Sequence, residues 1–173
     1  MKLLLTQALF TVHQKIKIED DKGQLRYTVK SGLIDIKDKT IIENADGDVV
    51  ARVERKPVSI HEVHKIHMET GKVRELEIAG KLIDPISDDF RIKGNDWKIK
   101  GRILEHDYKI IGKTGKKLAT VHKKWLSLRE VYVIDVEKEE RMDTIVAVVI
   151  ALEHIIQDRI TKDKKIRKAE ARG

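Results

Sequence analysis

The sequence predicts a mainly β protein, a closed antiparallel barrel of about twelve strands that is internally duplicated around a hydrophobic C-terminal α-helix. Two observations predict this fold class. The middle of the chain contains the same hairpin-like pattern twice, and the C-terminal segment is apolar with helical spacing. So many antiparallel strands favour closure, because a closed sheet has no unpaired edges.

The composition fits one globular domain. The chain has 173 residues, of which 40% are hydrophobic, and it contains no cysteine, so disulfides and thiolate metal sites are excluded. We expect a single domain over residues 1–160, with pseudo-repeats at about 10–80 and 88–140, and a basic tail over 161–173. The tail is expected to fray.

The duplication is visible without gaps. Residues Gly47–Glu69 align with Gly115–Glu137 at a constant displacement, and about nine of these twenty-three positions are identical. Identical pairs include Ala51 with Ala119 and Val53 with Val121. Such self-similarity is typical of a repeated structural unit.

Within each half, apolar alternation enters and leaves glycine-containing turns. These turns centre on Gly23, Gly47 and Gly71 in the first half and on Gly115 in the second. Alternation around such turns predicts antiparallel hairpins. In the second half the first turn falls at Gly94 rather than near position 91, which predicts a slip in the repeat.

The C-terminal segment predicts a core helix over 143–160. Ile145–Leu152 is apolar on every side, and later apolar residues recur at spacings of three and four. Asp143 or Thr144 is expected to supply the N-cap oxygen. A helix that is apolar all round must be enclosed, and the barrel is the available container. A buried strand over 145–152 is the alternative, because β-branched residues lower helix propensity.

Several residues carry a family resemblance over nearly the whole chain. The stretch FRIKGNDWKIKGRILEHDYKIIGKTGKKLATVHKKWLSLREVYVIDV, the opening LFTVHQKIKIEDDKGQLRYTVKSGL and the AVVIALEHI helix resemble the LURP-one-related family. Its K-K-W-x-S-L-x-x-x-Y element corresponds here to Lys123, Lys124, Trp125, Ser127, Leu128 and Tyr132. The chain departs from the family pattern at Glu153, where an aspartate is expected. It also departs in its first repeat, where Pro57 occupies the position equivalent to Trp125. This proline predicts an edge, bulge or loop.

The resemblance implies a tubby C-terminal-like barrel of twelve strands around a hydrophobic helix. The family has no established enzymatic activity, so the resemblance implies a non-enzyme. Tubby relatives bind phosphoinositide lipids, and scramblase relatives are membrane-associated and calcium-responsive. Their lipid-contacting residues do not match positions of this chain one by one, so none is carried over.

The chain offers no clear catalytic, metal or cofactor motif. His61, His64 and His67 are spaced by three in a predicted strand, so the middle ring points away from the other two. Ser59 and Ser127 recur at equivalent positions without a nucleophile elbow. His106 and His154 have no partner that the sequence identifies. We therefore predict no catalytic residue, no metal and no cofactor.

The remaining signal is electrostatic. The net charge is +7, and the basic pairs Arg55 with Lys56 and Lys123 with Lys124 occupy equivalent positions in the two repeats. The expected partner is an anionic phospholipid or a protein, met through these four residues. Aromatic residues make up 4%, which disfavours nucleic acid.

We expect this chain to be a non-catalytic binding or scaffold protein. We expect it to be located in the cytoplasm, where it could also associate peripherally with a membrane. The longest apolar run is too short to span a bilayer, and the opening MKLLLTQALF is too interrupted for a signal core. The alternative is a carrier of a small hydrophobic ligand that uses the barrel lumen. A filled lumen would argue against the carrier.

Overall fold

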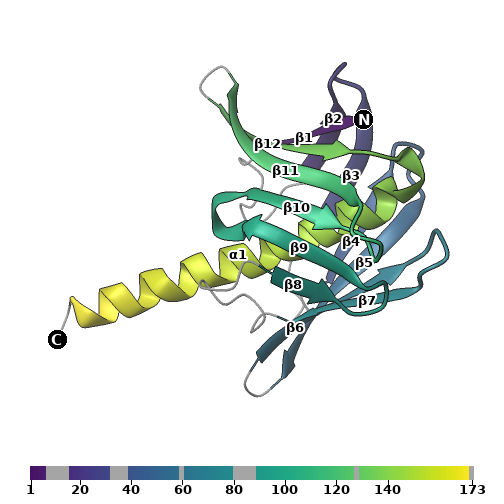
Figure 1. The fold of residues 1–173 in the computed structure, drawn as a ribbon. Helices are drawn as coiled ribbons and strands as arrows, with labels where there is room; N and C mark the ends of the chain where they lie inside the picture. The colour runs from purple at the N-terminus through teal and green to yellow at the C-terminus, as the bar shows by residue number, and fades with distance from the viewer. Residues whose placement is uncertain (7–15, 32–38, 59–60, 80–88, 127–128, 172–173) are drawn as a thin grey trace.

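The computed structural model describes residues 1–6, 16–31, 39–58, 61–79, 89–126 and 129–171, and its elements are drawn in Figure 1. In chain order they are β1 (Lys2–Thr6), β2 (Ile16–Asp20), β3 (Leu25–Ser31), β4 (Lys39–Asn44), β5 (Val49–Val58), β6 (His61–Met68), β7 (Glu75–Ala79), β8 (Asp89–Ile92), β9 (Trp97–Arg102), η3 (Ile103–Glu105), β10 (Asp107–Ile111), β11 (Lys117–Leu126), β12 (Arg129–Val136), η4 (Glu139–Arg141) and α1 (Met142–Glu170). The predicted fold class, a β-barrel with a C-terminal helix, is confirmed.

The twelve strands form one antiparallel sheet that curls into a nearly closed barrel. Their order is β7-β6-β5-β4-β3-β2-β1-β12-β11-β10-β9-β8. The two ends of this order meet at a seam, where Glu77 and Lys93 exchange backbone hydrogen bonds of 3.1 Å in both directions. The Lys93 Nζ atom also lies 2.9 Å from Glu77 Oε1. The seam therefore has a single described bridge, whereas β1 joins the halves continuously through ladders to β2 and β12.

The strand registers reproduce the duplication seen in the sequence. β5 pairs Ala51 with Met68 of β6, and β11 pairs the equivalent Ala119 with Val136 of β12, so the partners are equivalent as well. An irregularity of register follows Ile42 in β4 and recurs after its equivalent, Ile110, in β10. The two halves thus share their hydrogen-bonding pattern across three consecutive strands.

The predicted slip in the second half is also present. Val29 of β3 lies opposite Ile42, whereas Ile99 of β9 lies opposite Ile110. The position equivalent to Val29 by the alignment of the later strands is Trp97, so β9 has slipped by two positions relative to β3. Such a slip keeps the alternation of faces, because side chains in a strand alternate with period two. Both Val29 and Ile99 are buried in the core.

Five predicted turn glycines have a left-handed backbone, with positive φ at Gly23, Gly47, Gly71, Gly94 and Gly115. At Gly94 a side chain is excluded for a second reason. An added Cβ would lie 2.2 Å from the carbonyl oxygen of Glu75, across the seam. Gly23, in the corresponding turn of the first half, has nothing within 4 Å of such a Cβ.

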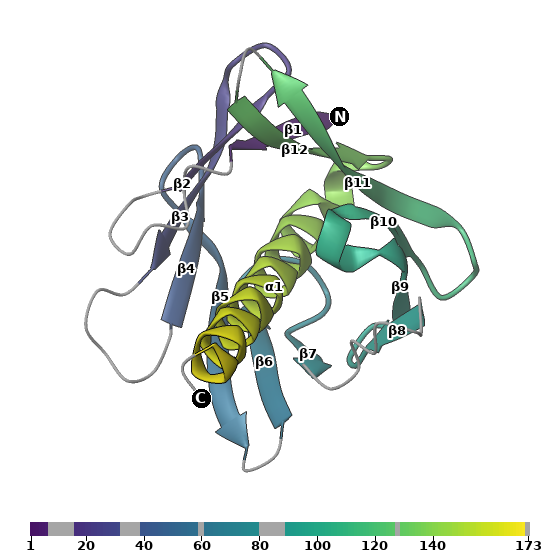
Figure 2. The same ribbon diagram turned by 90° about the vertical axis from the view of Figure 1, so that its left-hand side faces the viewer.

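Helix α1 fills the barrel, as Figure 2 shows in a view toward its C-terminal end. Every side chain from Ile145 to Leu152 is fully buried, and Ile155 and Ile156 follow at 1% and 0% exposure. The segment is helical, so the alternative of a buried strand over 145–152 is wrong. Enclosure overrides the low helix propensity of β-branched residues, because burying their side chains stabilises far more than that propensity costs.

The helix differs from the prediction at both ends. It continues to Glu170, past the predicted end at 160, so the tail up to that residue is helical where fraying was expected. The expected N-cap is wrong, because η4 runs directly into α1 and Arg141 precedes it without a side-chain cap. Asp143 lies inside the first turn instead. Its carboxylate accepts hydrogen bonds from the Tyr27 hydroxyl at 2.6 Å and from the Thr70 hydroxyl at 2.7 Å.

Pro57 lies within β5, in register with Glu62 of β6. The described ladder between β4 and β5 ends at the pair of Lys39 with Glu54, so Pro57 lies beyond it. A proline is tolerated there because its missing N–H breaks no described bond to β4. The edge, bulge or loop expected at Pro57 stays a prediction, because residues 32–38, which precede β4, lie outside the described part of the chain.

Candidate functional site

Polar side chains interrupt the apolar interior at one level of α1. In the second half, His106 Nε2 lies 2.9 Å from Glu153 Oε1, and the exposed fractions of the two side chains are 6% and 0%. The His106 ring stacks on Tyr132 with ring centroids 4.0 Å apart. Tyr108 lies beside them, and within the described part of the chain the hydroxyls of Tyr108 and Tyr132 have no hydrogen-bond partner.

The backbone helps to place His106 in this cluster. His106 ends η3 in the left-handed conformation with φ of 54°, which few residues other than glycine adopt. The His106 amide donates to Ile103 O at 3.0 Å, and the side chain is directed to the buried carboxylate of Glu153.

The first half has polar side chains at the equivalent positions. By the alignment of the two repeats, Thr40 corresponds to Tyr108 and His64 to Tyr132. Thr40 Oγ1 lies 3.1 Å from His154 Nε2, and the His64 and His154 rings have centroids 6.1 Å apart. We name this ring of residues the polar collar, and it consists of Thr40, His64, His106, Tyr108, Tyr132, Glu153 and His154. Because 153 and 154 are adjacent on α1, the helix presents the acid to one half and the imidazole to the other.

The electrostatics of the collar favour neutral phenols. Burial raises the pKa of Tyr108 well above its ordinary value, and the nearby Glu153 charge raises it further. Burial and then Glu153 raise the pKa of Tyr132 in the same direction. Neither phenol ionises near neutral pH, so neither serves there as a base. The contact between His106 and Glu153 instead joins the end of η3 to α1 inside the barrel.

The collar was not predicted from the sequence. His106 and His154 had no partner there, and the structure pairs one with Glu153 and the other with Thr40. A signal was present, since Thr40 and Tyr108 occupy the same inward position in both repeats.

The described histidine side chains of β6, those of His64 and His67, do not point toward one another. His64 and His67 lie on opposite faces of the strand, with His64 buried and His67 Nδ1 3.2 Å from Glu75 Oε1. The side chain of His61 lies outside the described residues, as do the side chains of Ser59 and Ser127.

The C-terminal ends of β5 and β11, which carry the predicted basic pairs, lie at the end of the barrel from which α1 emerges (Figure 1). β5 and β11 run parallel to each other, because all neighbouring strands are antiparallel and five strands separate them on either side. Arg55 and Lys123 share the inward alternation of Val53 and Val121, with Arg55 half-buried and Lys123 exposed. Lys124 is exposed on the outward face, and the side chain of Lys56 lies outside the described residues. Arg55 therefore lies on the opposite side of the helix from Lys123 and Lys124, and these three residues do not form one patch.

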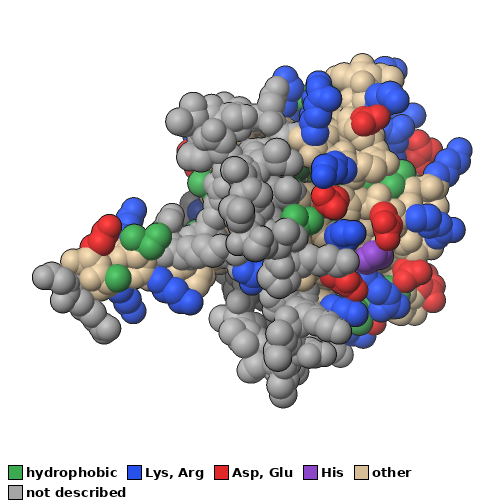
Figure 3. All heavy atoms as spheres, turned by 90° about the horizontal axis from the view of Figure 1, so that it is seen from below, with side chains coloured by type: hydrophobic (Ala, Val, Ile, Leu, Met, Phe, Trp, Pro, Cys, Tyr) green, Lys and Arg blue, Asp and Glu red, His purple; other side chains and the backbone are tan. Residues whose placement is uncertain are grey.

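The emerging part of α1 adds charge between these pairs. Lys164, Lys165, Arg167 and Lys168 are exposed, and Ile166 is the most exposed large hydrophobic residue of the described chain, at 55%. Figure 3 shows this segment projecting from the body with lysine and arginine side chains along it. We name the ends of β5 and β11 together with residues 160–170 of α1 the helix-exit end.

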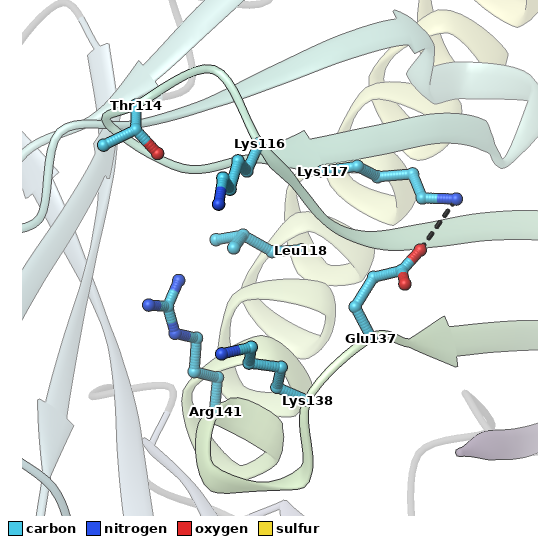
Figure 4. Close-up of a pocket in the computed structure, with 7 residues that line it drawn as sticks. All are labelled: Thr114, Lys116, Lys117, Leu118, Glu137, Lys138 and Arg141. Atoms are coloured by element: carbon cyan, nitrogen blue, oxygen red, sulfur yellow. Dashed lines mark ion pairs between the residues drawn. The ribbon is translucent and has the colours of Figure 1, made fainter.

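A pocket lies at the opposite end of the barrel, where α1 begins. Its volume is about 450 Å³, and Figure 4 shows its lining. The β10–β11 turn and the start of β11 contribute Thr114, Lys116, Lys117 and Leu118, and the connection from β12 to α1 contributes Glu137, Lys138 and Arg141. Lys117 Nζ pairs with Glu137 Oε1 at 2.8 Å. The pocket was not predicted from the sequence, because turn packing brings its two segments together and no local motif marks it.

The described residues contain neither a metal-binding cluster nor a membrane-spanning helix. They contain no group of three or more histidine, aspartate or glutamate side chains placed to hold a metal ion. Among them, no helix combines the length and the apolar character that crossing a membrane requires.

The chain resembles known proteins over most of its length. The LURP-one-related family model matches residues 1–153. An uncharacterized protein of Bacillus subtilis (strain 168), YxjI, is 22% identical over 156 residues, which cover 90% of this chain and 94% of that protein. A solved structure of a protein from Arabidopsis thaliana, AT5G01750, has 15% identity and a TM-score of 0.49, covering 88% of this chain and 91% of the other.

Proposed function

Because the chain belongs to the LURP-one-related family, we propose that it is a non-catalytic binding protein that contacts anionic phospholipid through its helix-exit end. One observation carries the proposal. A helical extension with four exposed basic residues leaves the barrel between the ends of β5 and β11, where Lys123 and Lys124 are also exposed. The protein would then be cytoplasmic and peripheral at the membrane surface.

The expected strength follows from the charges. Each basic residue close to an anionic membrane contributes on the order of 1 kcal/mol. Not all of these residues can reach one flat surface, since Lys123 and Arg55 lie on opposite sides of the helix. The association is therefore weak and sensitive to salt, because the Debye length is about 10 Å at 0.1 M ionic strength. Ile160 and Ile166 add apolar contact, with exposures of 37% and 55%.

Two features support a non-catalytic role and a role outside the lumen. The collar residues His106, Tyr108, Tyr132 and Glu153 are buried in the barrel interior, almost entirely out of contact with solvent. The helix occupies the space that a carrier of a hydrophobic ligand needs, with Ile145–Leu152 fully buried. No observation on the described residues favours the carrier alternative.

Sedimentation with vesicles tests the proposal. Vesicles of phosphatidylcholine alone are compared with vesicles that also contain phosphatidylserine, at low and moderate salt. We expect co-sedimentation with the anionic vesicles at low salt only. Equal recovery in the supernatant with both kinds of vesicle would remove the phospholipid version and leave a protein partner.

A matched pair of variants locates the contact. Lys164→Glu with Lys168→Glu reverses two charges on one face of the extension, and Lys98→Glu with Lys109→Glu makes the same change on the barrel wall. We expect the first pair to abolish co-sedimentation and the second to reduce it slightly. Equal losses would indicate that net charge, and not the helix-exit end, determines binding.

A further inference from the structure

We propose that the pocket between the β10–β11 turn and the start of α1 binds a phosphate monoester. This site lies at the opposite end of the barrel from the helix-exit end, so it does not rest on the function proposed above. The chain would then have two separate anion-binding regions, one on an exposed helix and one in a concave pocket.

The pocket holds positive charge that the protein itself does not neutralise. Its lining has four basic side chains and one carboxylate, and Lys117 is paired with that carboxylate at 2.8 Å. Figure 4 shows Lys116, Lys138 and Arg141 directed toward one another around Leu118, while Lys117 points away toward Glu137. Lys116 and Lys138 have no ion-pair partner in the part of the chain that the structure describes. The contact of Arg141 with Glu140 is long, at 3.9 Å.

The first repeat shows that the turn does not need these cations to fold. By the alignment of the repeats, the positions equivalent to Thr114 and Lys116 are Asp46 and Asp48. Both turns nevertheless close in the same way. The Gly47 amide donates to Asn44 O at 3.1 Å, and the Gly115 amide donates to Gly112 O at 2.9 Å.

Lys138 differs from its equivalent in the first repeat, Thr70, whose hydroxyl donates to Asp143 at 2.7 Å. Converging like charges repel one another, and in the first repeat the positions equivalent to Lys116 and Lys138 are not basic. A bound anion would turn that repulsion into attraction.

The chemistry of the lining selects phosphate among anions. An arginine guanidinium forms paired hydrogen bonds with phosphate oxygens, and lysines add point charges. Lys116 and Lys138 have no ion-pair partner among the described residues, and Arg141 has only the long contact with Glu140. Together these cations match a group that carries up to two negative charges better than they match a carboxylate. The Thr114 hydroxyl can donate a further hydrogen bond. A volume of about 450 Å³ exceeds the needs of bare phosphate, and Leu118 offers an apolar surface to the esterified carbon chain.

The test uses the full chain and observes its backbone amides by NMR. Glycerol 3-phosphate is titrated as the soluble ester, and vesicles of phosphatidylcholine with phosphatidic acid present the same monoester on a lipid. We expect saturable shifts at Thr114, Gly115 and Arg141 with the soluble ester. If only the vesicles shift these amides, the source is a lipid headgroup. If neither ligand shifts them, or if the shifts do not saturate, the inference is wrong.

Charge variants test the residues. Lys116→Asp places in this turn the residue that the first repeat has at position 48, so we expect it to fold and to raise the apparent Kd for glycerol 3-phosphate about tenfold or more. Arg141→Gln should weaken binding similarly. Lys109→Asp, on the neighbouring strand and outside the pocket, is the matched control and should change the Kd less than about twofold. Equal weakening by Lys116→Asp and Lys109→Asp would overturn the inference.

The same variants separate this site from the helix-exit end. Lys116→Asp should leave co-sedimentation with phosphatidylserine vesicles unchanged, and the variant with Lys164→Glu and Lys168→Glu should keep the shifts at Gly115. Failure of one proposal therefore leaves the other intact. Loss of both activities in both variants would contradict two independent sites.

Discussion

The two halves of the barrel have the same backbone pairing and different side chains at the positions that matter most. β4, β5 and β6 share registers and a bulge with β10, β11 and β12. At equivalent inward positions the first half has Thr40 and His64 and the second has Tyr108 and Tyr132. At the equivalent turn, Asp48 faces solvent in one half and Lys116 lines a pocket in the other. Ladder hydrogen bonds and apolar alternation therefore specify this barrel, and polar positions within it are free to diverge.

The largest expected difference between the halves lies in the collar. Glu153→Ala should cost about 3–5 kcal/mol of unfolding free energy, because it leaves His106 buried without its carboxylate. His154→Ala should cost about 1–3 kcal/mol, because it removes a hydrogen bond to Thr40 and some packing. Urea unfolding at neutral pH measures both. Equal costs would show that the collar does not distinguish the halves.

The paired turns give the next largest difference. Gly94→Ala should cost on the order of 3 kcal/mol, because the positive φ is combined with a contact of 2.2 Å to Glu75 O across the seam. Gly23→Ala, with open space around it, should cost about 1–2 kcal/mol. Thermal unfolding of both variants checks this order. A larger loss at Gly23 would indicate that the seam is less closely packed than the structure describes.

Alkaline pH should distinguish the second half from the first at their paired inward positions. Burial raises the pKa of Tyr108 above its unfolded value, so the unfolded chain releases its proton first as the pH rises. Above about pH 10 the unfolded state binds fewer protons than the native state, and stability falls by up to about 1.4 kcal/mol per pH unit for each such group. Tyr108→Phe should be within about 1 kcal/mol of the parent protein at pH 7, since the hydroxyl has no partner among the described residues. Between pH 7 and pH 11 the free energy of unfolding should fall less in the variant than in the parent protein. Urea unfolding at the two pH values measures this. An equal fall in both proteins would contradict the prediction.

The smallest expected effect is on the stability of the turns. Asp48→Lys and Lys116→Asp exchange the charges of the equivalent positions, and each should change the free energy of unfolding by less than about 0.5 kcal/mol, because both sites are exposed. Guanidinium unfolding measures this. A loss above about 1 kcal/mol in Lys116→Asp would mean that the lysine has a structural role in its turn.

The parts of the fold that could be predicted are those that local sequence patterns specify. The repeat of Gly47–Glu69 at Gly115–Glu137 predicts the hairpins, and the apolar run from Ile145 predicts the enclosed helix. The extension of α1 to Glu170 was missed because its exposed residues have no apolar periodicity, although alanine, lysine and arginine are good helix formers. Asp143 was expected to be a cap because a sequence does not show that Tyr27 and Thr70 approach it from distant strands.

Less of the site was predictable. The basic residues Arg55, Lys56, Lys123 and Lys124 were singled out by the repeat, which indicates equivalence but not the side of the barrel on which each lies. The pocket and the collar depend on contacts between segments far apart in the chain, such as His106 with Glu153. A polar residue at an inward strand position is the signal that could have found the collar, and it is only interpretable once the neighbouring helix is placed.

The position of α1 has a consequence for biosynthesis. The helix that fills the barrel leaves the ribosome after every strand, and β1, made before the other strands, hydrogen-bonds to β12. Until α1 has emerged, the strands have nothing apolar to wrap around, and β1 lacks one of its two neighbours. Contacts between such distant parts of a chain form slowly. The nascent protein therefore exposes the apolar inner face of its strands while they are being made. Chaperones recognise exposed apolar surface of this kind.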